Sequence, residues 1–557
     1  MSVLLRQLFS RPLFAIELLA VTFCVHVLGL ASSIYTMLVL NRYVAHGLDA
    51  TLVTLTTGAV VAVILEYGFR QIRLKLAQGV TVRPDYRLGV RVFDRILTSS
   101  AATLYRLPPG EQREIVSSPG VIGRIHGPAN LVGLLDVPFA LLFVVILFFL
   151  EFWLGCVAGG FIGAALLISM LGHPLLRGPM RELSKAAAEA GAMGGAAMRA
   201  VDGVRAFNAQ SFLRERFRSR QEALARMQRG VEGRRERIQT ATQSLGMLMS
   251  IFMIAVGAKL VVTGQMDVGL LVGANILAGR AMAPILRLSQ LGASLTEARR
   301  AFETLGVFSR AAQERSGGVE LRTFAGRLEL QDVAFAHEEG SDPLFESLTF
   351  AVPPGASLVV SGANGTGKTT LARLLLGLLE PVRGQLLVDG VNLDQLSLEW
   401  WRRQVIYLPQ EPDFFEGTIR ENLTAFNPDL SNERLNAIIA EAGLTAFLHA
   451  SPKGLDTPML NGGVQLSLGI RKRLALARAL TGEGRIAVFD EPMEGMDHPG
   501  REAVSGVLNR MARSGRSVIL LSHDAELIQG ADIFLNLDRK PVPELRFKAS
   551  GTPGGAR

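Results

Sequence analysis

Six apolar runs of membrane-spanning length occupy the first half of this 557-residue chain. Each contains about 19 residues or more, close to the ~20 that a helix needs to cross the hydrocarbon core of a bilayer. The runs cover residues 14–40, 51–69, 131–150, 153–172, 242–262 and 267–288. We therefore predict a six-helix transmembrane domain within residues 1–300, and this domain excludes a soluble ATPase or any other soluble protein.

The composition agrees with a membrane protein and excludes several other classes. Charged residues make up 19% of the chain, below the roughly 25% that is usual for soluble domains, and the mean hydropathy is +0.29. Cys24 and Cys156 both lie in apolar runs, so neither a disulfide framework nor a cysteine metal cluster is expected. The first run is too long for a cleavable signal peptide and lacks a small-residue cleavage site.

The distribution of lysine and arginine predicts the orientation in the membrane. Three connections between the runs are short and contain one basic residue, Arg42; they cover 41–50, 151–152 and 263–266. The other two connections, 70–125 and 173–241, are rich in arginine. Because basic residues accumulate on the cytoplasmic side, both chain termini and both long connections are predicted to be cytoplasmic. This also accounts for the net charge of +8 without nucleic acid as a partner.

The two long connections have helical composition. Residues 182–229 are rich in Ala, Glu, Arg, Met and Gln and contain few helix breakers. Sixty helical residues span roughly 90 Å, so each connection can extend about 45 Å beyond the bilayer and return as a hairpin. We expect short docking segments at the turns of these hairpins, near residues 119–128 and 201–210.

The second half of the chain has the pattern of an α/β domain. Short apolar segments alternate with helical stretches between residues 326 and 545. A polar linker is predicted at 301–325, and a glycine-rich, disordered tail at 546–557. The expected fold is a six-helix transmembrane domain with long cytoplasmic helical extensions, followed by an α/β phosphate-loop domain.

A phosphate-binding loop identifies the chemistry of this second domain. Residues 362–369 fit the pattern G-x-x-x-x-G-K-[ST], follow an apolar strand and open a helix. The backbone N–H groups would surround phosphate oxygens, Lys368 would reach the β- and γ-phosphates of ATP, and Thr369 would ligate Mg²⁺. A chance glycine-rich turn is the alternative, which this context disfavours. The residues assigned to ATP are Gly362, Ala363, Asn364, Gly365, Thr366, Gly367, Lys368, Thr369 and Thr370.

Three further strand ends carry candidate catalytic groups. The apolar strand 485–490 ends in Asp490, placed to hold Mg²⁺, and the next residue, Glu491, is placed to activate a water molecule. Gln410 and His523 each follow a short apolar strand. Taken alone, an acidic strand end is usually a solvated turn and a lone histidine is usually structural, so these assignments depend on the phosphate loop.

With these motifs in place, residues 326–545 resemble an ATP-binding-cassette ATPase domain. Six motifs occur in the order of that family: the phosphate loop, Gln410, a signature loop at 466–470, the acidic strand end, an aspartate loop ending at Asp497, and the switch histidine His523. In the family, two cassettes pair head to tail. Each ATP is then held by the phosphate loop of one subunit and the signature loop of the other.

The resemblance implies roles for the remaining residues. Ser467 and Gly469 would contact the γ-phosphate on the second subunit, and His523 would also hold that phosphate. Gln410 would bind the metal and transmit the state of the site to the membrane domain. Asp497 and His337 are assigned to the nucleotide site as well, with His337 in place of the aromatic residue, usually tyrosine, that stacks on adenine.

The chain departs from the family pattern in the signature loop, which usually reads Leu-Ser-Gly-Gly-Gln. Leu468 stands in place of the first glycine and Ile470 in place of the glutamine. A branched side chain is strained at the positive φ that glycine adopts freely, so Leu468 must either take a compatible φ or shift the loop. Ile470 offers no hydrogen bond where a glutamine would. Because Lys368 and Glu491 are intact, a hydrolytic cassette is still predicted.

Six spans ahead of one cassette resemble an exporter half-transporter, which implies a homodimer. Residues 135–139, 154–155 and 276–284 resemble the type I protein-secretion exporters. The first span begins after 13 residues, so we expect the compact form without an N-terminal peptidase-like domain. The resemblance implies ATP-driven export of a polypeptide across the inner membrane, with a periplasmic adaptor (membrane fusion protein) and an outer-membrane channel as partners.

Two alternatives remain open at this point: a lipid or small-molecule exporter of the same architecture, and the degenerate half of a heterodimeric exporter. Arg280 is a further candidate functional residue, because it lies about 18 Å along the sixth span. A charge at that depth should face a pathway or a partner, unless the span ends earlier and Arg280 reaches the interface. Glu17 is expected at the interface, and His26 is expected to make a packed polar contact.

Overall fold

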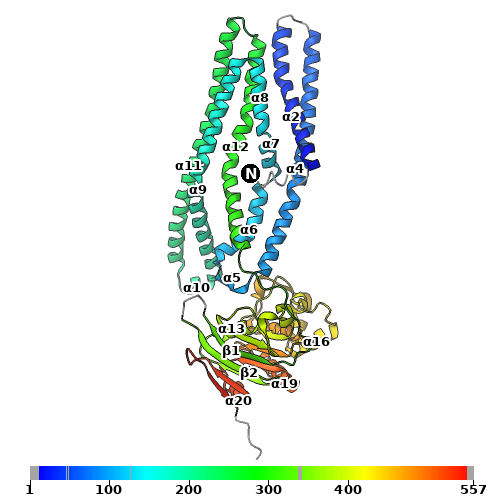
Figure 1. Ribbon diagram of the computed structural model, residues 1–557, viewed down its shortest axis with the longest axis vertical. Coiled ribbons are helices and arrows are strands. Elements are labelled where there is room, and N and C mark those ends of the chain that lie inside the picture. Colours follow the sequence, from blue (N-terminus) through cyan, green and yellow to red (C-terminus); the bar gives the residue numbers. More distant parts are fainter. Residues whose placement is uncertain (1–11, 45–46, 48, 126, 337–341, 549–557) are drawn as a thin grey trace, which may run out of the picture. The chain divides into compact units, whose positions relative to one another are not determined.

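A computed structural model describes residues 12–44, 47, 49–125, 127–336 and 342–548. His337 and most of the tail predicted at 546–557 lie outside these described residues. The chain divides near Ala312 into two compact units, and each is described by itself (Figure 1).

Among its described residues, the first unit contains six helical spans that are long and apolar enough to cross a membrane, which confirms the predicted six-helix domain. Its elements are α2 (Pro12–Leu38), the π-helix η1 (Val39–Tyr43), α4 (Asp49–Thr98), α5 (Ala101–Arg106), α6 (Pro109–Ile125), α7 (Pro128–Leu135), α8 (Val137–Leu150), α9 (Phe152–Arg199), α10 (Val201–Ala206), α11 (Gln210–Val262) and α12 (Val268–Ser309). The third span is interrupted at Asp136, because Pro138 in the first turn of α8 has no N–H to continue the hydrogen-bond ladder of α7.

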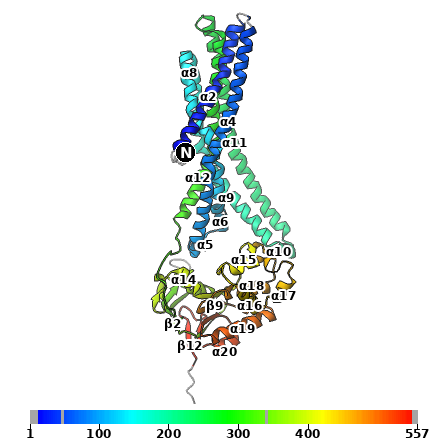
Figure 2. The same ribbon diagram turned by 90° about the vertical axis from the view of Figure 1, so that its right-hand side faces the viewer.

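Four of these helices continue well beyond their apolar parts: α4, α9, α11 and α12. The longest, α11, has 53 residues, or about 80 Å of helix against a hydrocarbon core of ~30 Å. Figures 1 and 2 both show α9 and α11 side by side, joined through the short α10. The helical composition of the long connections therefore corresponds to continuous helices.

One predicted turn lies elsewhere in the structure. Residues 119–125 belong to α6, which packs alongside α4, and the chain reverses instead at α5. Pro108 and Pro109 explain the position, because a proline disfavours helix at the residue before it but is accepted in the first turn of a new helix. The second predicted segment, 201–210, does coincide with a reversal, at α10.

The cassette is built around a six-stranded sheet with the order β12-β11-β3-β10-β9-β6. Its strands are β3 (Ser357–Ser361), β6 (Val405–Leu408), β9 (Ile486–Asp490), β10 (Ser517–Leu521), β11 (Ile533–Asn536) and β12 (Glu544–Phe547). All neighbours are parallel except β11 and β12. Every residue of β9 and β10 is buried, as expected for parallel strands covered on both faces. The carboxyl ends of β3, β6, β9 and β10 therefore meet at one edge, where ligands bind in such sheets.

A second, antiparallel sheet has the order β2-β1-β4-β5 and packs with the first around a core that includes Trp401. Its strands are β1 (Leu328–Phe335), β2 (Phe345–Val352), β4 (Arg383–Val388) and β5 (Val391–Asn392); β7 (Gly417–Thr418) and β8 (Pro458–Met459) form a separate pair. The cassette helices are α13 (Lys368–Leu375), η2 (Leu393–Gln395), α14 (Leu398–Arg403), α15 (Ile419–Thr424), α16 (Asn432–Glu441), α17 (Thr445–Ala450), η3 (Gly454–Asp456), η4 (Asn461–Gly463), α18 (Leu468–Leu480), α19 (His498–Arg513) and α20 (Ala525–Gly530).

Candidate nucleotide site and membrane polar cluster

The phosphate loop, residues 362–367, connects the end of β3 to the start of α13. Gly365 and Gly367 have φ angles of +85° and +109°, a backbone conformation that favours glycine. A Cβ atom on Gly367 would also lie 2.6 Å from Leu344. Thr369 and Thr370 follow in the first turn of α13. The loop and the helix N-terminus thus have the geometry that closes around phosphate oxygens.

Lys368 is buried and already has two oxygen partners. Its Nζ donates a hydrogen bond to the Gly362 carbonyl at 2.6 Å and lies 3.1 Å from Oε1 of Glu491. The side chains of Lys368 and Glu491 are 7% and 3% exposed. The structure therefore brings together the residue predicted to bind phosphate and the residue predicted to act as the base, although they are far apart in sequence.

Glu491 is held in an unusual backbone conformation. Its φ is +46°, which non-glycine residues adopt rarely and which is concentrated at functional sites. Its N–H donates to the carbonyl of Leu521 at 2.8 Å, and the Nδ1 atom of His523 lies 3.2 Å from its carboxylate. The turn after β9 is therefore fixed to the end of β10, with both predicted catalytic side chains in contact.

Asp490 has the properties of a metal ligand. Asp490 is 1% exposed, and neither of its carboxylate oxygens has a hydrogen-bond partner within the described parts of the chain. Burial and the charge of Glu491 raise the pKa of Asp490 above its ordinary value. The nearby Thr369 hydroxyl and the positive charge of Lys368 act in the opposite direction and lower this pKa. A buried carboxylate without a hydrogen bond is costly, and a divalent cation would supply the missing interaction. Asp490 and the hydroxyl of Thr369 are the oxygen ligands that Mg²⁺ prefers.

Gln410 links two parts of the site. Its Oε1 accepts a hydrogen bond from the Thr369 hydroxyl at 3.3 Å, and its Nε2 donates to Oε2 of Glu494 at 3.1 Å. Because β6 ends two residues earlier, the strand places this side chain at the same sheet edge as the phosphate loop. Gln410 therefore contacts Thr369, the predicted metal ligand, directly.

The signature and aspartate loops contact each other. Ser467 caps α18, and Asp497 caps α19 while accepting a hydrogen bond from Arg473 at 3.0 Å. A Cβ atom on Gly469 would lie 3.5 Å from Asp497. Within the described chain, no hydrogen bond or ion pair joins Ser467 or Gly469 to the phosphate loop.

Of the two outcomes expected at Leu468, the structure has the compatible backbone conformation. Leu468 is the first residue of α18 and has no left-handed φ, so the position does not need glycine for its conformation. Ile470 packs against the hydrophobic core of the cassette rather than facing a polar partner. The departures therefore remove a hydrogen-bonding side chain but do not distort the start of the helix.

Sequence analysis missed Lys472, which belongs to the same site. Lys472 is 5% exposed, and its Nζ donates a hydrogen bond to the backbone carbonyl of Glu494. Burial lowers the pKa of Lys472, while the nearby charges of Glu494, Glu491 and Asp490 oppose the shift. The signal was present, because Lys472 lies in a run of three basic residues, 471–473, directly before the mainly apolar part of α18.

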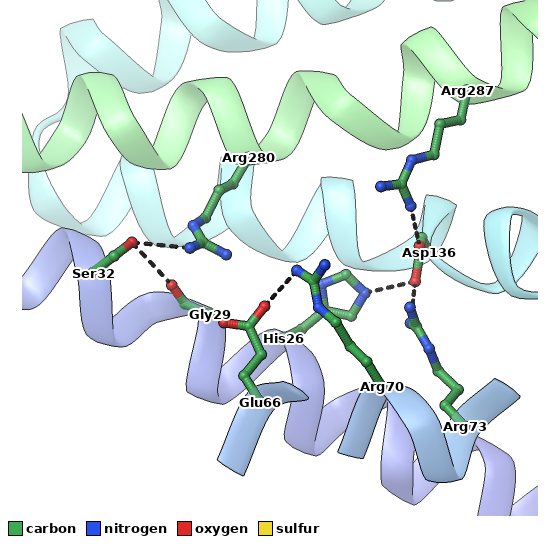
Figure 3. A network of polar contacts seen from close by, with 9 residues as sticks. All are labelled: His26, Gly29, Ser32, Glu66, Arg70, Arg73, Asp136, Arg280 and Arg287. Carbon is green, nitrogen blue, oxygen red and sulfur yellow. Dashed lines mark hydrogen bonds and ion pairs between the residues drawn. The ribbon is translucent and has the colours of Figure 1, made fainter. Parts of the chain in front are cut away.

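A second polar cluster lies among the spans (Figure 3). Asp136, at the junction of α7 and α8, is contacted by Nε2 of His26 at 2.9 Å, by Arg73 at 2.7 Å and by Arg287 at 3.2 Å. The ring of His26 also stacks on Phe139, 4.3 Å between centroids. His26 thus makes the packed polar contact expected from the sequence.

A membrane domain of six spans joined to a cassette with this phosphate loop and acidic strand end defines an ATP-hydrolysing membrane transporter. Comparisons with known families agree. The family model described as the ABC transporter transmembrane region matches residues 15–284, and the model described as ABC transporter matches residues 345–494. The chain is therefore an ATP-binding-cassette exporter, with its transmembrane and ATPase domains in one polypeptide.

Similar proteins are known among curated sequences and solved structures. A leukotoxin translocation ATP-binding protein of Pasteurella haemolytica-like sp. (strain 5943B) is 24% identical over 535 residues, which cover 96% of this chain and 75% of the relative. The alpha-hemolysin translocation ATP-binding protein of Escherichia coli O157:H7 is 25% identical over 542 residues, 95% of this chain and 75% of the relative. A bacterial Atm1-family ABC exporter with ATP bound has the same fold, with a TM-score of 0.84, 20% identity and coverage of 96% and 95% of the two chains.

Proposed function

We propose that this chain is the permease/ATPase of a type I secretion system, which uses ATP hydrolysis to export a polypeptide across the inner membrane. The observation that carries the proposal is the likeness to proteins named for translocation of leukotoxin and alpha-hemolysin. This likeness extends over both domains, so it is more than a shared ATPase cassette.

In this proposal, each site residue has its own role in ATP hydrolysis. When ATP binds, Lys368 exchanges its contact with Glu491 for the β- and γ-phosphates, which frees the Glu491 carboxylate to accept the proton of the attacking water. His523 contacts the γ-phosphate from the end of β10. Bound Mg²⁺ neutralises phosphate charge, and Asp490, Thr369 and Gln410 are the residues that would hold it.

A second copy of the chain would complete each nucleotide site. Among the described residues, neither Ser467 nor Gly469 is hydrogen-bonded to the phosphate loop of its own chain, which agrees with the proposal that they act on ATP held by the partner. Both termini and the cassette would be cytoplasmic. A periplasmic adaptor and an outer-membrane channel would continue the path of the polypeptide.

Partner dependence tests this function against lipid or small-molecule export. The tagged Glu491→Gln variant, held with ATP, should be cross-linked in native envelope membranes and its partners identified by mass spectrometry. A polypeptide exporter should capture a periplasmic adaptor. Transfer of lipid between leaflets by the purified chain alone in liposomes, with no adaptor captured, would instead establish a lipid exporter.

The signature loop favours one second candidate, the degenerate half of a heterodimeric exporter. Ile470 stands where the family has glutamine, so the loop lacks the amide side chain that the family uses there. The discriminating observation is whether the purified chain hydrolyses ATP alone or only after a different half-transporter is added.

A further inference from the structure

Two arginines lie on one face of the sixth span. Arg280 and Arg287 are seven residues apart in α12, within the candidate span Val268–Leu288. Seven residues make almost two helical turns, which places the two Cα atoms about 10.5 Å apart along the axis and on the same side. Figure 3 shows both side chains extending from this side of α12, Arg280 toward α2 and Arg287 toward Asp136.

Arg280 has no acidic partner in the described chain. Its Nη2 donates to the Ser32 hydroxyl at 2.9 Å, and this is its one hydrogen bond among the residues described. A Cβ atom on Gly29 would lie 2.6 Å from Nη1, so this glycine allows the guanidinium group to approach α2. A hydroxyl cannot neutralise the guanidinium charge, and an unneutralised charge at this depth is costly and typical of a functional site.

Arg287 is only partly neutralised. Its Nη1 lies 3.2 Å from Oδ2 of Asp136, but Arg73 and His26 contact the other oxygen of the same carboxylate. The side chain of Arg287 is 56% exposed, whereas that of Arg73 is 8% exposed. Asp136 is therefore mainly the counter-ion of the buried Arg73. The outer part of the Arg287 guanidinium group remains accessible.

The cluster as a whole carries a surplus of positive charge. The four arginines, at positions 70, 73, 280 and 287, face two carboxylates, Glu66 and Asp136, so the net charge is 4 − 2 = +2 with His26 neutral. Arg70 pairs with Glu66, which leaves the surplus on α12.

We propose that Arg280 and Arg287 form an anion-binding ladder that engages carboxylate side chains of the exported polypeptide. The inference rests on the proposed function and adds the chemistry of the cargo segment. The Cα atoms of the two arginines are about 10.5 Å apart along the helix axis. This spacing is comparable with the ~9 Å between carboxylate side chains three residues apart on one face of an unfolded chain in the polyproline II conformation, which has three residues per turn and rises ~3.1 Å per residue. A single lipid headgroup phosphate would occupy one arginine and leave the other unmatched.

Peptide binding tests the ladder. The purified full-length chain is placed in phosphatidylcholine nanodiscs and titrated with an unstructured glycine–serine peptide that carries two glutamates three residues apart and a dye of zero net charge. The matched peptide has glutamines at these positions. Fluorescence anisotropy should show the glutamate peptide binding about tenfold more tightly or better, as expected for charge-assisted hydrogen bonds.

Variants test whether Arg280 causes the preference for the glutamate peptide over the glutamine peptide. Arg280→Gln should reduce this preference to about twofold or less, and Arg280→Lys, which keeps the charge, should retain part of it. Arg280→Gln leaves no acidic group without its partner, so the fold should persist. Arg299→Gln is the control in the same helix, because Arg299 is 66% exposed and pairs with Glu303.

Two results would overturn the ladder, and they bear differently on the proposed function. Equal binding of both peptides, unchanged by Arg280→Gln, removes the ladder while polypeptide export stands. If neither peptide binds, both the ladder and the polypeptide cargo are contradicted. The contradiction is strongest if anionic lipid added to the nanodisc stimulates ATP turnover in a way that depends on Arg280.

Discussion

The Nζ atom of Lys368 lies 3.1 Å from the carboxylate of Glu491, and both side chains are buried. This ion pair joins the residue that we assign to phosphate binding with the residue that we assign as the base. A buried carboxylate without a partner is strongly destabilising, so the pair holds the Glu491 side chain in place. We expect ATP to compete with Glu491 for Lys368, which would couple nucleotide binding to release of the base.

Replacing Glu491 by glutamine should separate binding from hydrolysis. The amide of Glu491→Gln cannot accept the proton of water, whereas the phosphate loop is untouched, so ATP binding should persist and turnover should fall ~10²-fold or more. Binding is measured with a fluorescent ATP analogue and turnover by phosphate release. Glu399→Gln, an exposed residue paired with Arg403, is the control. Turnover within about threefold of the unchanged chain would show that Glu491 is not the base.

Replacing Asp490 by asparagine should remove the dependence of nucleotide binding on Mg²⁺. Both oxygens of Asp490 are buried and unsatisfied in the described chain, so the proposed metal is their main partner. For Asp490→Asn, we expect ATP affinities with Mg²⁺ and with EDTA to become similar, while the unchanged chain binds more tightly with Mg²⁺. Isothermal titration calorimetry measures both. A variant that keeps the full difference would place the metal elsewhere.

The signature loop should limit basal turnover without limiting ATP binding. Ile470 offers no polar group to a partner's nucleotide, so we expect the purified homodimer to bind ATP normally and to hydrolyse it slowly. The double substitution of Leu468→Gly and Ile470→Gln should raise turnover several-fold. Because the partly buried Ile470 packs against the hydrophobic core, the melting temperature of the variant is measured beside its activity. A correctly folded variant with unchanged turnover would show that the departures are neutral.

Thiol labelling tests the predicted orientation. In a chain without Cys24 and Cys156, Gln265→Cys should react with an impermeant maleimide from outside the cell, and Ser219→Cys should react only after the membrane is permeabilised. Gln265 is preferable to its neighbour Gly264, whose φ of +74° would strain a cysteine. Both chosen positions are exposed in the structure. The reverse labelling pattern would invert the topology and the direction of export.

Local patterns predicted much of the structure. Apolar run length predicted the six spans, and motif spacing at the ends of short strands predicted that residues 362–369, Asp490 and His523 would meet. This succeeds because the carboxyl ends of neighbouring parallel strands necessarily share one edge. The turn predicted near residues 119–128 was misplaced, because the structure keeps Pro119 inside α6 and reverses the chain at α5.

Contacts between distant helices could not be predicted in the same way. Nothing local to Asp136 indicates that Arg73 and Arg287, from two other helices, would contact it. The pairing of Lys472 with the Glu494 carbonyl likewise depends on how α18 packs beside the acidic loop. Such contacts arise from tertiary packing, and a single sequence shows only that a charged residue needs some partner.

The most direct test of ATP-driven polypeptide export is the secreted protein profile of the native host. The medium is compared by quantitative mass spectrometry for cells that carry the unchanged chain, no chain, or the Glu491→Gln variant at equal abundance. We expect at least one polypeptide to be lost from the medium in the second and third cases and to return with the unchanged chain. An identical profile in all three cells, with the chain present and active as an ATPase, would contradict the account.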